Sequence, residues 1–150
     1  MSCLKSCFTN PDLNKKLMWA GISAAIFVGV SMPQTYNLTK QYRQTTVDNC
    51  PTGEGKLIHA GLFFALNFLA MKAAARYKWN GLDTHSDREL AQYAAYGTLL
   101  FFVLISTDVF NVTHSVLGIT ITATGCPTQT GVFVHAVVYM VVLVVLMYFK

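Results

Sequence analysis

Two histidines, His59 and His135, carry the strongest chemical signal in this chain of 150 residues. Each belongs to a copy of one motif, Cys-Pro-Thr-x-x-Gly-x-x-x-His-Ala, and the copies lie 76 residues apart, from Cys50 to Cys126. The matching positions are Cys50, Pro51, Thr52, Gly55, His59 and Ala60 in the first copy, and Cys126, Pro127, Thr128, Gly131, His135 and Ala136 in the second. Each copy leads into a long apolar run, so we expect both histidines near the start of a membrane-spanning helix.

A histidine at that depth is costly unless it has a partner. We therefore expect His59 and His135 to hydrogen-bond a backbone carbonyl or a hydroxyl and to fix helix packing. The alternative is a cofactor, because two histidines related by a repeat could be the axial ligands of one haem. Neither partner span has a second histidine at matching depth, and His85 stands alone without zinc-like spacing, so we predict no metal site.

The two cysteines of the motif, Cys50 and Cys126, occupy equivalent positions on the predicted oxidising side of the membrane. A disulfide between them is chemically reasonable there, and the alternatives are two free thiols or two separate bonds to other chains.

Two N-glycosylation acceptor patterns precede the motif, at Asn37-Leu38-Thr39 and at Asn111-Val112-Thr113. Both lie within a few residues of a predicted span end, which crowds a membrane-bound modifying enzyme. We therefore favour a role for Asn37 and Asn111, with the threonines, in capping or turning the chain. Glycosylation stays open as the alternative.

Several function classes lack their usual residues. The sequence has no Ser-His-Asp set, no paired carboxylates in the apolar runs and no phosphate-binding glycine loop, so we predict that the chain is not an enzyme. No basic block interleaved with aromatics suggests nucleic acid. A channel or transporter would need a line of intramembrane polar groups, and Asn67, expected to bond a neighbouring helix, is an isolated case.

The composition predicts the elements that position the motif. The chain is 53% hydrophobic and 12% charged, against about 25% charged in soluble domains. A membrane-spanning helix needs about 20 mostly apolar residues, and four stretches approach this. We predict an all-α integral membrane protein with four transmembrane helices as two tandem hairpin repeats in parallel orientation. The predicted segments are a cytosolic arm (1–16), hairpin repeat 1 (17–76, spans about 17–33 and 57–75), a cytosolic connector (77–92) and hairpin repeat 2 (93–150, spans about 93–110 and 132–149).

Lysine and arginine predict the orientation in the membrane, because cytosolic loops carry an excess of them. Eight lie on the side of the termini and connector: Lys5, Lys15, Lys16, Lys72, Arg76, Lys78, Arg88 and Lys150. Three lie on the other side: Lys40, Arg43 and Lys56. We therefore predict that both termini are cytosolic and that the motif loops face the lumen or exterior.

The repeat extends upstream of the motif, where Tyr36-Asn37-Leu38-Thr39 matches Phe110-Asn111-Val112-Thr113. Both copies begin and end on the same side, and such repeats usually pack about an axis along the membrane normal. A four-helix bundle and two side-by-side hairpins both fit this pattern.

This repeat unit resembles short multi-span membrane proteins of nucleocytoplasmic large DNA viruses. Their pattern is Pro-x-x-Tyr-x-Leu-Thr, a short loop, then Gly-Cys-Pro-Thr-x-x-Gly-x-x-x-His-Ala and an apolar helix. The first copy supplies Pro33, Tyr36, Leu38 and Thr39 before its motif, and the second supplies Phe110, Val112, Thr113 and Gly125. Thr107, Phe110 and Asn49 depart from the pattern, which leaves the exit of the third span open. The resemblance covers most of residues 31–71 and 105–147.

The resemblance implies a structural protein of a virion, in its internal membrane or in the host ER-derived membrane that supplies it. The implied partners are the lipid bilayer, capsid or other virion membrane proteins, and further copies of the chain. No catalytic residue and no cofactor are implied. The alternatives are a haem-binding protein that uses His59 and His135, and an accessory subunit of an organellar membrane complex.

Overall fold

Helices make up most of the computed structural model, which describes residues 11–47, 50–78, 85–122 and 125–149. The long helices are α2 (Pro11–Ser31), α4 (Gly53–Arg76), α5 (Asp87–Leu104) and α7 (Gln129–Leu146). Two short helices, α3 (Pro33–Thr39) and α6 (Thr107–Leu117), follow α2 and α5. A hairpin of two antiparallel strands with two residues each, β1 (Thr46–Val47) and β2 (Cys50–Pro51), precedes α4. The predicted all-α class is confirmed.

The helices have the length and composition of membrane spans. Helices α4 and α7 are each long and apolar enough to cross a membrane, with mean hydropathies of 1.6 and 2.1. The pairs α2–α3 and α5–α6 are long and apolar enough only when the two helices of a pair are counted as one span. Each pair is bent by 59° at the break between its helices. The described residues thus contain two helices able to cross a membrane, or up to four spans if each bent pair is one. These helices indicate a membrane protein.

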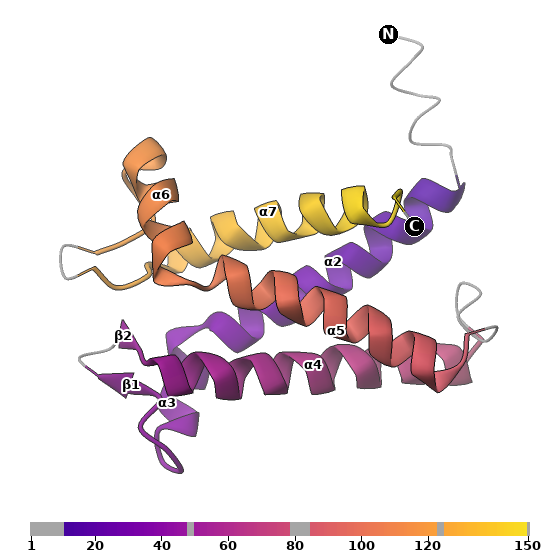
Figure 1. Ribbon diagram of the computed structural model, residues 1–150, viewed down its shortest axis with the longest axis horizontal. Coiled ribbons are helices and arrows are strands. Elements are labelled where there is room, and N and C mark those ends of the chain that lie inside the picture. The colour runs from indigo at the N-terminus through magenta and orange to yellow at the C-terminus, as the bar shows by residue number, and fades with distance from the viewer. Residues whose placement is uncertain (1–10, 48–49, 79–84, 123–124, 150) are drawn as a thin grey trace, which may run out of the picture.

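The long helices form a bundle in which the main packing partners come from different repeats. Helix α4 packs most extensively on α5, and α2 on α7, while α2–α4 and α5–α7 make smaller contacts. Helices α2 and α4 of repeat 1 correspond to α5 and α7 of repeat 2. Exchanging the repeats therefore turns the α4–α5 pair into the α7–α2 pair and the α2–α4 pair into the α5–α7 pair, so the packing is pseudo-twofold. Figure 1 shows α3, α6 and the hairpin at one end, and the start of α2 with the ends of α4 and α7 at the other. We name the first the motif end and the second the basic end.

Four aromatic side chains at equivalent repeat positions fill the bundle centre. Phe27 and Phe101 come from α2 and α5, and Phe63 and Tyr139 from α4 and α7, all of them fully buried. Phe63 and Phe101 stack with ring centroids 4.3 Å apart. The Tyr139 hydroxyl departs from the repeat symmetry, because the equivalent residue Phe63 has none. It lies 2.7 Å from Ser23 Oγ and occupies space that Gly97 leaves open by having no Cβ.

The first helix differs from its predicted bounds. It begins at Pro11, so the end of the predicted arm (1–16) is helical, while residues 1–10 lie outside the described residues. An ion pair between Lys16 and Asp12 at 2.9 Å stabilises this first turn. The helix ends at Ser31 because a residue before proline disfavours the helical conformation, and Met32 is extended at φ −65° and ψ 142°.

The segment predicted as the third span (about 93–110) contains the end of α5 and the start of α6, so its helices have other bounds. Helix α5 begins at Asp87 because Ser86 and Glu89 form a capping box, and it ends at Leu104. Ser106 is extended at φ −66° and ψ 144°, and its side chain accepts a hydrogen bond from Val109 N–H, which starts α6. A serine cap thus makes the same break in repeat 2 that proline makes in repeat 1.

Candidate functional site

Each copy of the motif starts its helix with a threonine cap. Thr52 Oγ1 accepts a hydrogen bond from Gly55 N–H at 3.0 Å, and Thr128 Oγ1 accepts one from Gly131 N–H at 2.9 Å. Such caps satisfy N–H groups that the first helical turn leaves unpaired. Each hydroxyl also donates to the preceding loop, Thr52 to the Gln44 carbonyl at 2.9 Å and Thr128 to the Ile119 carbonyl at 2.8 Å.

The glycine of the motif permits the loop backbone to touch the helix. A Cβ at Gly55 would collide with the Thr45 carbonyl, and one at Gly131 with the Thr120 carbonyl. The same two carbonyls accept hydrogen bonds from Thr52 N–H at 2.9 Å and Thr128 N–H at 3.0 Å. Glycine is therefore required by close approach of the backbone rather than by an unusual φ.

The histidines join the new helix to the helix break before it. His59 Nδ1 lies 2.7 Å from the Val30 carbonyl, and its Nε2 lies 2.9 Å from Thr39 Oγ1. In repeat 2, His135 Nδ1 lies 2.7 Å from the Leu104 carbonyl, and its Nε2 lies 2.8 Å from Thr113 Oγ1. Carbonyls in the last turn of a helix have no partner within that helix. Each histidine therefore supplies the donor that the break leaves missing.

These contacts determine which ring nitrogen carries the proton. A carbonyl only accepts, so the N–H must be on Nδ1, and in the neutral ring Nε2 then accepts from the threonine hydroxyl. The rings are fully buried and lie flat on aromatic neighbours, His59 on Tyr36 at 3.6 Å and His135 on Phe110 at 3.8 Å. Both nitrogens of each ring are thus engaged, and axial ligation of a haem would require breaking one of these bonds.

A third threonine in the site of each repeat was not anticipated from the sequence. Thr45 and Thr120 are fully buried, and their hydroxyls donate to the Tyr36 carbonyl at 2.9 Å and the Phe110 carbonyl at 3.1 Å. They were missed because their separation, 45 to 120, fits neither the motif spacing nor the upstream spacing. An alignment of the two loops with one inserted residue on each side of the threonine would have found them.

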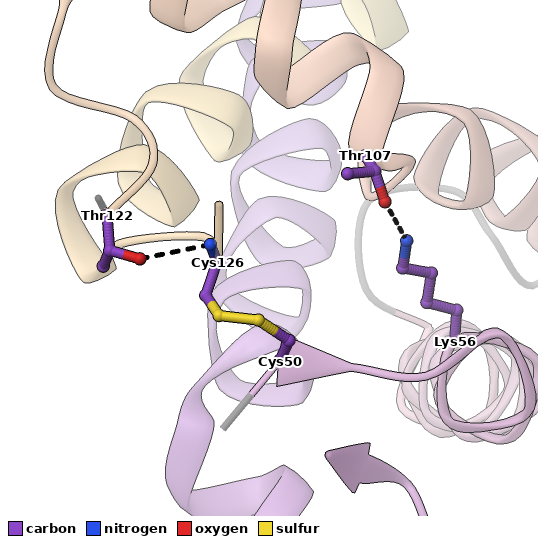
Figure 2. The surroundings of a disulfide bond; sticks show 5 residues. All are labelled: Cys50, Lys56, Thr107, Thr122 and Cys126. Atoms are coloured by element: carbon purple, nitrogen blue, oxygen red, sulfur yellow. Dashed lines mark hydrogen bonds between the residues drawn. A yellow bond between two sulfur atoms is a disulfide. The ribbon is translucent and has the colours of Figure 1, made fainter. Parts of the chain in front are cut away.

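The structure joins the two motif copies covalently through a disulfide between Cys50 and Cys126, with a Cα–Cα distance of 5.0 Å (Figure 2). Cys126 N–H donates to Thr122 Oγ1 at 3.1 Å beside the bond. Lys56 Nζ donates to Thr107 Oγ1 at 2.7 Å and adds a hydrogen bond between the repeats at this end of the bundle (Figure 2).

Two polar predictions need correction. Asn37 and Asn111 do not cap or turn the chain: they lie exposed within α3 and α6, and it is Thr39 and Thr113 that bind the histidines. Asn67 does not bond a neighbouring helix: its Nδ2 donates to the Phe63 carbonyl of its own helix at 3.0 Å.

Neither a metal site in the described residues nor a match to a known protein indicates the family or function of the chain. Among residues 11–47, 50–78, 85–122 and 125–149, no three His, Cys, Asp or Glu side chains are placed to hold a metal ion. Comparison with protein-family models, curated proteins and solved structures gave no match. The resemblance to viral membrane proteins therefore stays a prediction that rests on the motif.

Removing the histidine donor should destabilise the fold. His59→Ala leaves the Val30 carbonyl unpaired in an apolar environment, which should lower the free energy of unfolding in detergent micelles by about 1–3 kcal/mol. His135→Ala should lose a similar amount, whereas the control His85→Ala at the basic end should not. Thr39→Val should cost less when His59 is already alanine, because the two share a hydrogen bond. Equal stability of all three histidine variants would contradict this role.

The glycine contact gives a matched pair of substitutions. Gly55→Ala should lower the free energy of unfolding by about 1–3 kcal/mol, because the new Cβ overlaps backbone atoms that cannot move aside. Gly61→Ala, in the same helix with nothing within 4 Å of its Cβ position, is the control. Chemical unfolding of both variants in one detergent measures the difference, and no difference would exclude the close approach.

Proposed function

We propose that the chain is a structural membrane protein of a large DNA virus, which forms a four-span bundle in the internal membrane of the virion. The observation that supports this most is that the motif bonds to its own chain. The histidine nitrogens, the capping threonines and the cysteines of both copies all have partners within the fold. The residues best suited to chemistry thus hold the bundle together, which suits a mechanical role.

The orientation is supported by two independent signals. Six of the nine lysines and arginines in the described part of the chain lie at the basic end: Lys15, Lys16, Lys72, Arg76, Lys78 and Arg88. The other three, Lys40, Arg43 and Lys56, lie at the motif end. The disulfide lies at the opposite end, and disulfides persist in oxidising compartments. We propose that the basic end faces the cytosol, with both termini, and that the motif end faces the lumen or exterior.

Lipid is the first proposed partner. Val137, Val141 and Val145 form an exposed apolar stripe along α7, and their side chains are 59%, 54% and 47% exposed. Leu66 and Leu69 add exposed apolar surface on α4. In a bilayer these side chains contact acyl chains. Capsid proteins, or further copies of the chain, would then contact one of the two ends, either the basic end or the loops around the disulfide.

The location of the protein tests this function. Antibody detection and mass spectrometry should find the chain in gradient-purified virus particles, in the layer that non-ionic detergent extracts, with cross-links to capsid proteins. Host organelle fractions prepared from the same cells are the control. Recovery only in organelles, together with respiratory or photosynthetic subunits, would overturn the virion proposal in favour of an accessory subunit.

A further inference from the structure

A small cavity lies at the motif end, between the helix break of repeat 1 and the loops joined by the disulfide. Its volume is about 30 Å³. Ser31, Tyr36 and Thr46 line it from repeat 1, and Pro127 and Val132 line it from repeat 2. It therefore lies where the two repeats meet.

Two residues that line this cavity carry hydroxyls with no hydrogen-bond partner in the described part of the chain. Ser31 Oγ and Thr46 Oγ1 are both buried without a partner, on residues that are only 9% and 3% exposed. Buried hydroxyls are nearly always satisfied, and an orphaned one is destabilising. Both residues line the same cavity, so a single polar guest there could satisfy both hydroxyls.

Repeat 2 shows that the fold itself does not need these hydroxyls. Ser31 corresponds to Ile105, and Tyr36 corresponds to Phe110 at the same spacing. Thr46 corresponds to Ile121, because Thr46 pairs with Pro51 as Ile121 pairs with Pro127. The three hydroxyl-bearing residues that line the cavity thus have apolar counterparts. Ile105 and Phe110 are buried in repeat 2 as Ser31 and Tyr36 are in repeat 1.

We propose that this cavity binds one structural water molecule, which bridges Ser31 Oγ on α2 and Thr46 Oγ1 on β1. A water needs at least about 10–15 Å³ and two to four polar partners. The cavity has that volume, and it is lined by the two residues with orphaned hydroxyls and by Tyr36. Such a water ties the helix break to the hairpin that carries Cys50. The break in repeat 1 is then hydrated, and the break in repeat 2 is closed by apolar packing.

The proposal predicts the sign of two near-isosteric substitutions. Thr46→Val and Ser31→Ala each remove one partner of the water, so each should lower Tm in detergent by about 2–4 °C. The double variant should lose less than the sum, because both residues act through the same water. Thr98→Val is the control, since its hydroxyl bonds a carbonyl of its own helix at 2.8 Å.

Without the water, the two hydroxyls are unpaired, and removing each should raise Tm additively. An increase in Tm, or strict additivity, would therefore overturn the proposal. A structure at a resolution that shows waters gives the direct test. Density for one water within hydrogen-bond distance of Ser31 Oγ and Thr46 Oγ1 is expected, and a closed cavity or a larger guest would contradict it.

Discussion

The fold depends on how a helix can end inside an apolar environment. The last turns of α2 and α5 leave carbonyls without donors, and lipid offers none. His59 and His135 reach back from the next long helix and supply an N–H to Val30 and Leu104. Proline in repeat 1 and the serine cap in repeat 2 make the break, and this bond pairs a carbonyl that the break leaves open and joins the two long helices of each repeat. The threonine caps and the glycine contacts hold the loop in the place that this bond defines.

Comparison of the two repeats separates what the architecture requires from what it tolerates. The break is made by Pro33 in one copy and by the Ser106 cap in the other, yet both bends are 59°. The histidine stacks on Tyr36 in one copy and on Phe110 in the other. The contacts that keep the same chemistry in both copies are those of the histidine, the threonine caps, the glycine and the buried loop threonine, Thr45 or Thr120. The hydroxyls of Ser31, Tyr36 and Thr46 have apolar counterparts in repeat 2, which is why they point to a separate role.

The sequence predicted the site better than the helix boundaries. The cost of burying an imidazole was enough to predict carbonyl or hydroxyl partners, and His59 has one of each. The break before Ser106 was not visible, because no proline marks it and a serine cap is ambiguous within an apolar run. The pairing of α4 with α5 was not readable either, because helices that are apolar all round show no preferred face. Thr45 and Thr120 were hidden by loops of different length.

Nitrogen-15 NMR of the imidazole rings, with the chain labelled at histidine in detergent or lipid, tests the central claim most directly. We predict that His59 and His135 are both neutral and protonated at Nδ1, with a pyrrole-type Nδ1 signal and a pyridine-type Nε2 signal. Substitution of each histidine assigns its signals. The Nε2-protonated tautomer in either ring, or signals typical of metal ligation, would contradict the claim that these histidines complete the helix breaks.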